Sequence, residues 1–195
     1  YYHDWAVRIS RGEATTGTYE MTPLYAWALG ALFKTFGYGL LLPRLLQAFA
    51  GAGTCAMVAW LGLRIFGRAE GIVAGLALAL YGPALFHEAQ IMKTVLTVTL
   101  STATAAVLWR SGGSRPRVLA AAGALAGLTA LAQENINITL PILLGWIAWR
   151  APRGRRLLCG AALVAGFVIV VSPATIRNYA VSGDFVLITS GGGEV

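Results

Sequence analysis

The sequence is short of charged side chains. Of its 195 residues, 12% are Asp, Glu, Lys or Arg and 57% are hydrophobic, and the mean hydropathy is +0.67. An ordinary soluble domain has about 25% charged residues. Too few charges are present here to cover the surface of a soluble protein. The composition therefore excludes an ordinary soluble domain and predicts a polytopic membrane protein.

Cysteine is rare, and the motifs of nucleotide and metal chemistry are absent. The two cysteines, Cys55 and Cys159, each lie in an apolar run, where a single cysteine is usually a small core residue. They offer neither a disulfide framework nor metal-ligand spacing. No Walker motif, GxGxxG, HExxH or paired Cys/His spacing occurs in the sequence. These absences argue against a nucleotide-driven enzyme and against a metal hydrolase.

What the sequence has instead is a series of apolar runs separated by short polar breaks. We expect a first outer loop with short amphipathic helices (1–39), a transmembrane helical bundle (40–175) and the start of another outer loop (176–195). The pattern predicts an all-α fold whose bundle has about six spans, at 41–66, 70–86, 91–109, 117–132, 135–149 and 157–174. Because the chain begins with Tyr1 and stops in "SGGGEV", we expect a fragment truncated at both ends.

Smaller signals predict local structure. In the first loop, "YYHDWAVRISRG" favours a short helix that ends at Gly12, and "TPLYAWALGALFKTFG" favours a helix that lies in the membrane interface. The tail "DFVLITSGGG" favours a short strand followed by a glycine run. The stretches "GIVAG" and "GALAG" have the spacing of small residues that lets two membrane helices approach closely.

The breaks between the predicted spans alternate in charge. Three of them hold nine arginines and a single acid, Glu70, whereas seven of the eight acids fall in the other breaks and the terminal segments. Lys and Arg gather in cytoplasmic loops. The net charge of +7 is therefore explained by topology, and we expect membrane lipids and no nucleic acid as partners. The nine arginines are Arg64, Arg68, Arg110, Arg115, Arg117, Arg150, Arg153, Arg155 and Arg156.

The breaks that are then predicted to face outward hold the candidate functional side chains. One break contains His87, Glu88 and Lys93, which form either a solvated turn or the wall of a polar cavity. A second contains Glu134 and Asn135, at a place where a simple turn would more often use Gly, Ser or Pro.

Arg177 and Asn178 follow the last predicted span on the same side. An arginine on the outer side runs against the charge bias, so it either snorkels to the interface or binds an anion such as a phosphate.

Six stretches of the sequence, taken in order, carry a resemblance to a known family, and together they cover essentially the whole chain. They are "YYHDWAVRISRGE", "YEMTPLYAWALGALFKTFG", "RLLQAFAGAGTCAMVAWLGLRIFGR", "GIVAGLALALYGPALFHEA", "GLTALAQENINITLPILLGWIAWR" and "VSPATIRNYAVSGDFVLITSGGGEV". This order resembles GT-C membrane glycosyltransferases of the protein mannosyltransferase and aminoarabinose transferase branch (glycosyltransferase family 39-like). The most specific pieces are "PLYAWALGALFKTFG" and "TIRNYAVSGDFVLITSGGG".

The resemblance implies an inverting transfer of a sugar from a polyprenyl-phosphate carrier to a lipid, glycan or protein acceptor. The site would lie on the outer face of a bacterial inner or plasma membrane. In the family, the catalytic Asp lies just before the position of Tyr1, so Asp4 would be a neighbour of that residue. Glu20 matches an acidic position that precedes the proline, here Pro23. The Lys that aminoarabinose transferases carry near Met21 or Thr22 is lacking. No cofactor is implied with certainty, and a divalent metal is left open.

From these residues we expect Asp4 and Glu20 to be the catalytic acids. Lys93 and Arg177 are expected to hold the phosphate, assisted by the other candidates. Those are His87, Glu88, Glu134, Asn135 and Asn178. The alternative reading is a segment of a transporter or flippase for a lipid-linked or anionic substrate, which would place ionisable groups near the bilayer midplane and break its helices at equivalent positions in two halves.

Overall fold

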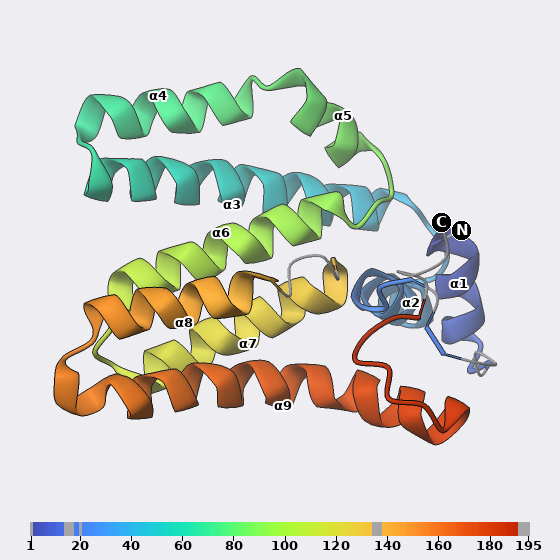
Figure 1. Cartoon of the computed structure of the whole chain (residues 1–195). Helices are drawn as coiled ribbons and strands as arrows, with labels where there is room; N and C mark the ends of the chain where they lie inside the picture. Colours follow the sequence, from blue (N-terminus) through green and yellow to red (C-terminus); the bar gives the residue numbers. More distant parts are fainter. Residues whose placement is uncertain (1, 14–17, 20, 134–137, 191–195) are drawn as a thin grey trace. The chain divides into compact units, whose positions relative to one another are not determined.

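The computed structural model describes every residue except 1, 14–17, 20, 134–137 and 191–195. All the regular elements in these described ranges are helices (Figure 1), which confirms the all-α prediction. The chain divides into two compact units. The first unit consists of 1–13 with 25–106, and the second of 14–24 with 107–195.

The first unit begins with the two helices that the sequence predicts for the outer loop. Helix α1 (Tyr2–Ser10) ends before Gly12, whose φ of +75° suits glycine. Helix α2 (Leu24–Phe36) buries Tyr25, Leu29 and Phe33, which are spaced one turn apart, against Ala6 of α1. These apolar contacts form the core of this part of the unit.

Helices α3 (Leu41–Ile65) and α4 (Arg68–Ala79) form an antiparallel hairpin (Figure 1). A Cβ on Gly75 would lie 2.7 Å from the Ala59 Cβ, and one on Gly62 would lie 2.8 Å from the Gly71 Cα. The two backbones therefore approach so closely because these positions carry no side chain. This confirms the prediction made from "GIVAG".

After α4 the chain bends. Helix α5 (Gly82–Ala89) has Pro83 in its first turn and lies at 49° to α4 across a short break. Helix α6 (Thr94–Ser111) follows and crosses the division between the two units. Its threonine hydroxyls donate to carbonyls one turn back, as Thr99 does to the Val95 oxygen at 2.8 Å. Such bonds satisfy the hydrogen-bonding capacity of hydroxyl groups on an otherwise apolar helix.

In the second unit, α7 (Pro116–Ala132) and α9 (Arg156–Ser182) pack side by side and parallel, linked through α8 (Thr139–Arg150) and a 3₁₀ turn, η2 (Arg153–Arg155) (Figure 1). A Cβ on Gly123 would collide with the Leu163 carbonyl, and one on Gly127 would lie 2.9 Å from the Phe167 carbonyl oxygen. The close approach that "GALAG" predicts is thus confirmed as well.

We expect Gly123→Ala to destabilise the second unit by about 1–3 kcal/mol, because the added methyl group must push α7 away from the Leu163 carbonyl. The matched control is Gly145→Ala in α8, where a Cβ meets nothing within 4 Å. Removing a helical glycine at such a position stabilises by about 0.5–1 kcal/mol. Reversible unfolding in mixed micelles measures both changes, and equal shifts for the two variants would contradict the packing.

Helix α9 continues further than the sequence predicts. The expected span ends at residue 174, whereas the helix passes Pro173 and ends at Ser182, capped by Gly183 with φ +76°. Proline cannot bond the carbonyl four residues back. Here the Ser172 hydroxyl donates to that carbonyl, on Ile169, at 3.2 Å, so the helix carries on. Arg177 and Asn178 consequently lie on the helix and not in the loop after it.

The short strand predicted from "DFVLITSGGG" is wrong for the described residues 184–190, which have no regular secondary structure. Side chains of α9 bond to their backbone instead. The Thr175 hydroxyl donates to the Leu187 carbonyl at 2.7 Å, and the Asn178 amide donates to the Ile188 carbonyl at 2.9 Å. Because a helix supplies the partners for these carbonyls, the segment does not need a neighbouring strand.

The number of spans is a further correction. By length and composition, two helices among the described residues can cross a membrane, Leu41–Ile65 and Arg153–Ser182, or three if the bent pair α4–α5 counts as one span. The six apolar runs do form helices at the expected places, but α8 has only 12 residues. At a rise of about 1.5 Å per residue it reaches about 18 Å, short of a hydrocarbon core of about 30 Å. Helix α7 has 17 residues, and the hydroxyl side chains of α6 lower its hydropathy.

Candidate functional site

The first unit contains a cavity of about 340 Å³ behind the α4–α5 bend. Helices α3, α4, α5 and α6 each supply part of its wall. A cavity of this size lies at the lower end of the range for small-molecule sites, about 300–1,000 Å³. Its lining residues are Gly51, Thr54, Cys55, Leu78, Tyr81, Pro83, Ala84, His87, Glu88, Thr94, Val95 and Val98.

Glu88 enters this cavity from α5 and lies against the backbone of α3. A Cβ on Gly51 would collide with the Glu88 carboxylate, one of whose oxygens, Oε2, would be 2.8 Å away. The absence of a side chain at Gly51 therefore makes room for the carboxylate. Gly53, on the same helix, has nothing within 4 Å of its Cβ position. The glycine at 51 thus has a specific role beside Glu88, and the one at 53 does not.

His87 lines the same cavity. Its Nδ1 atom is buried and has no hydrogen-bond partner among the described residues. A buried nitrogen without a partner is unfavourable by about 1–3 kcal/mol unless something satisfies it. The Phe86 ring packs edge-on to the imidazole, with 5.7 Å between ring centres. The His87 residue therefore forms part of the cavity wall, and Glu88 supplies the carboxylate that can bond to a polar molecule there.

Gln47, which the sequence reasoning missed, holds this site together. It is 8% exposed within an apolar helix. Its amide nitrogen donates to the Gln90 carbonyl at 3.0 Å and to the Met92 carbonyl at 3.4 Å, so it fixes the α5–α6 connection to α3. The sequence does contain a signal for this role: Gln47 is a single amide side chain within a predicted span, and a buried polar group needs a hydrogen-bond partner.

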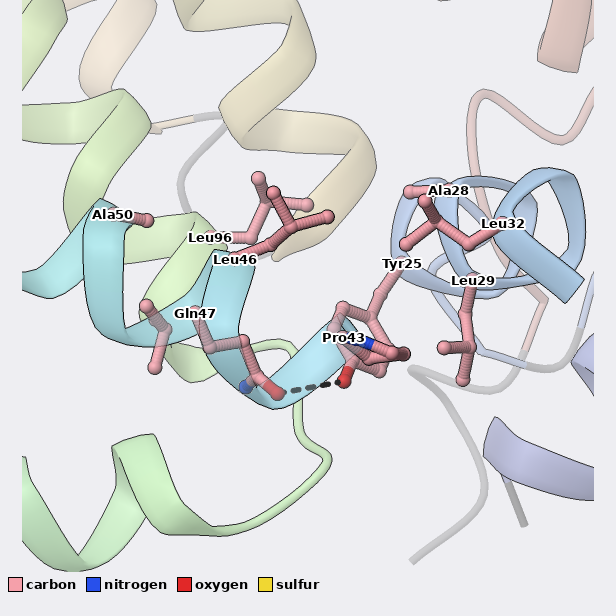
Figure 2. A pocket seen from close by; sticks show the side chains of 10 residues that line it. Tyr25, Ala28, Leu29, Leu32, Pro43, Leu46, Gln47, Ala50 and Leu96 are labelled. Atoms are coloured by element: carbon pink, nitrogen blue, oxygen red, sulfur yellow. Dashed lines mark hydrogen bonds between the residues drawn. The ribbon is translucent and has the colours of Figure 1, made fainter. Parts of the chain in front are cut away.

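On its other side Gln47 borders a second, apolar cavity of about 160 Å³ between α2, α3 and α6 (Figure 2). Tyr25 of α2 donates from its hydroxyl to the Gln47 Oε1 at 3.5 Å. Burial raises the pKa of the Tyr25 phenol, so the hydroxyl keeps the proton that this bond uses. Leu29, Leu46 and other apolar side chains line the rest, which makes this cavity a packing feature without groups for chemistry.

The other candidates in the first unit lie outside the main cavity. Lys93 is half-buried in the α5–α6 connection, directly before Thr94, which does line the cavity. Asp4 projects from α1 with 79% of its side chain exposed and its Oδ1 3.4 Å from the His3 Nδ1. The hydrogen bond with His3 holds the pKa of Asp4 below its usual value, which weakens this carboxylate as a base.

Arg177 belongs to the second unit. Its guanidinium carbon lies 4.2 Å from the centre of the Tyr19 ring, a cation–π contact between the last turns of α9 and the chain before α2. Its Nη1 donates to the Asn178 Oδ1 at 3.5 Å. Stacking of this kind fixes the plane of the guanidinium group.

Asn178 is fully buried and ties three segments together. Its Oδ1 accepts from the Tyr19 backbone nitrogen at 3.3 Å, and its amide nitrogen donates to the Ile188 carbonyl. The Ser190 nitrogen also donates to the Tyr19 carbonyl at 2.9 Å. Asn178 therefore holds Tyr19 and the tail beside Arg177. The two segments predicted to face outward, before α2 and after α9, meet at this point.

The structure thus brings His87 and Glu88 together in one cavity and places Arg177 beside Asn178 in the other unit. Glu20, Glu134 and Asn135 lie outside the described residues. Within the described residues no group of three or more His, Cys, Asp or Glu side chains is arranged to hold a metal ion.

The fold defines a class: an all-helical protein with apolar helices long enough to cross a membrane. No family model, curated protein or solved structure matches the chain.

Proposed function

We propose that the chain is the membrane part of a GT-C type glycosyltransferase, which moves a sugar from a polyprenyl-phosphate carrier to an acceptor hydroxyl at the outer face of the membrane. The observation that carries this proposal is the cavity behind the α4–α5 bend, whose wall includes His87 and Glu88, with the Glu88 carboxylate lying against Gly51. Sugars are recognised by carboxylates and by nitrogen donors that bond to hydroxyl groups.

The chemistry follows from these groups. A carboxylate accepts the proton of the acceptor hydroxyl, whose oxygen attacks the anomeric carbon from the face opposite the leaving group. The bond between that carbon and the phosphate oxygen breaks, the anomeric centre inverts, and the carrier phosphate leaves with the electron pair. Glu88 is the carboxylate that we assign to this step, with Asp4 and Glu20 as further candidates. Lys93, directly before Thr94 of the cavity wall, is the cation that we assign to the charge of the departing phosphate, and Arg177 is the further candidate that the sequence predicts for this role.

The direct test is a transfer assay with the full-length protein in proteoliposomes. The donor is a radiolabelled sugar on polyprenyl phosphate, and the acceptors are a lipid, a glycan and a peptide. We expect label to move to an acceptor without added nucleotide, and a nucleotide sugar to be inert as a donor. If the folded protein transfers no label from any polyprenyl-phosphate sugar, the proposal is wrong.

A second candidate function is transport of a lipid-linked or anionic substrate. The bent pair α4–α5 favours it, because transporters often use broken helices around their binding sites. Transporters built from repeats would show such a break in each half, whereas the described residues contain one bent pair. Movement of labelled substrate across the bilayer without a new covalent product would support transport over transfer.

The proposed site requires a defined topology, with the turn after α3, which carries Arg68, in the cytoplasm. In a background of Cys55→Ala and Cys159→Ala, we expect Gly39→Cys, before α3, to react with a membrane-impermeant maleimide from outside in intact cells. Arg68→Cys should react only after the membrane is opened. Labelling in the reverse order would invert the topology and place the proposed site on the wrong side.

A further inference from the structure

One end of the second unit carries a dense surface of arginines. Two turns meet there: a Cβ on Gly113, in the α6–α7 turn, would lie 3.1 Å from the Arg150 Cγ and 3.4 Å from the Ala151 nitrogen, in the turn after α8. All seven arginines in these two turns and at the adjoining helix ends are exposed. We call them the arginine surface: Arg110, Arg115, Arg117, Arg150, Arg153, Arg155 and Arg156.

The charge of the arginine surface is not neutralised within the described part of this unit. None of its side chains forms an ion pair there, and the single described acid of the unit, Asp184, follows the opposite end of α9. Moreover, α7 and α9 both begin at this surface, and cations at the start of a helix oppose its dipole. Such an arrangement repels itself unless anions from outside the chain bind to it.

The residues beside the arginines indicate what kind of anion this is. Trp109 is 42% exposed and Trp149 76% exposed, at the ends of α6 and α8. Leu157 and Leu158, directly after Arg156, are 91% and 60% exposed. Tryptophan is typical of the headgroup level of a bilayer, and exposed leucines suit its acyl chains. A soluble polyanion would leave these leucines in water, so the surface is suited to a lipid boundary.

We propose that the arginine surface binds the phosphate headgroups of anionic phospholipids, with Trp149 at the level of the headgroups and Leu157 among the acyl chains. The binding is independent of sugar transfer, because it involves none of the residues of the proposed active site. The bilayer then supplies the negative charge that the described residues of the unit lack, and it secures the end of the unit at which both parallel helices begin.

The test uses the full chain in nanodiscs made of equal amounts of phosphatidylglycerol and phosphatidylcholine. After mild detergent extraction, the lipids that remain bound are counted by native mass spectrometry. We expect wild-type protein to retain phosphatidylglycerol in clear preference, and high salt to reduce that preference. Each basic side chain near an anionic surface adds about fivefold to such a preference. Removing three charges should therefore reduce it by about a hundredfold.

The variant is Arg115→Gln/Arg153→Gln/Arg155→Gln, and the matched control is Arg8→Gln/Arg11→Gln/Lys34→Gln, which removes equal charge from α1, the residue after it and α2. The first should lose the preference and the control should keep it. Equal preferences in the two variants, or a wild-type protein that retains both lipids equally or is unaffected by salt, would overturn the proposal. So would full displacement of the bound lipid by inorganic phosphate or by a short DNA duplex, because the surface would then recognise a soluble anion.

Discussion

Glu88→Gln in the full-length protein is expected to reduce the turnover number for sugar transfer by about a hundredfold to ten-thousandfold. The amide keeps the shape of the side chain but cannot accept the proton of the acceptor hydroxyl, and general-base catalysis contributes about that much. The effect should fall on kcat more than on KM, because the substrate still enters the same cavity. Steady-state transfer assays over a range of acceptor concentrations measure the two constants. Unchanged turnover would remove Glu88 from the mechanism.

The glycines of α3 provide a matched pair that tests the position of the carboxylate. Gly51→Ala places a methyl group where the Glu88 carboxylate lies, whereas Gly53→Ala meets nothing within 4 Å. We expect Gly51→Ala to lower turnover and Gly53→Ala to leave it unchanged. If Gly51→Ala acts through the carboxylate, adding it to Glu88→Gln should cause little further loss, since the effects of coupled residues do not add. Fully additive losses would show that Gly51 acts by another route.

Arg177→Ala should have the second large effect, a loss of about a hundredfold to a thousandfold in turnover. A positioned donor that stabilises charge in the transition state contributes about that much. Arg177→Lys should recover only part of the activity, because an ammonium group cannot replace a planar guanidinium stacked on Tyr19. The loss should be larger for donors that leave as phosphate than for an activated donor with a neutral leaving group.

Arg64 supplies the control for this experiment. It also lies over an aromatic ring, 5.9 Å from the centre of Trp60, but on a break predicted to be cytoplasmic. Arg64→Ala therefore removes a similar contact at a residue that does not line the proposed cavity, and transfer should proceed normally. Equal losses in Arg64→Ala and Arg177→Ala, together with lower thermal stability in both, would mean that these arginines stabilise the protein and do not bind the phosphate.

Much of the fold could be predicted because it depends on neighbours in sequence. The positions of the helices follow from runs of apolar residues, and the close approaches at Gly71 and Gly123 follow from small residues four apart. The number of spans was overestimated because an apolar run and a membrane-crossing helix look alike until helix length is known. The predicted end of α9 was also too early, since the bond from Ser172 that lets the helix pass Pro173 is not visible in a hydropathy pattern.

The candidate site was predictable only in its residue types. His87, Glu88 and Lys93 were predicted as one group because they lie in the same polar break. The structure places only His87 and Glu88 in the lining of the cavity. Arg177 and Asn178 are adjacent in sequence and have different environments. The arginine stacks on Tyr19, whereas the asparagine is fully buried and bonds to backbone groups. Neighbouring residues on a helix point in different directions, so sequence adjacency does not decide which of them reaches a substrate.

The sequence by itself determined that the described regular elements would be helices, several of them apolar. Its shortage of charge and its runs of apolar residues predict apolar helices, and they do so because every residue contributes to hydropathy independently of the others. Only the tertiary structure decided which polar groups share a space. Gln47 bonds to a carbonyl 43 residues away, and Asn178 to a nitrogen 159 residues away. Such contacts arise from the packing of whole helices, which no local pattern in the chain specifies.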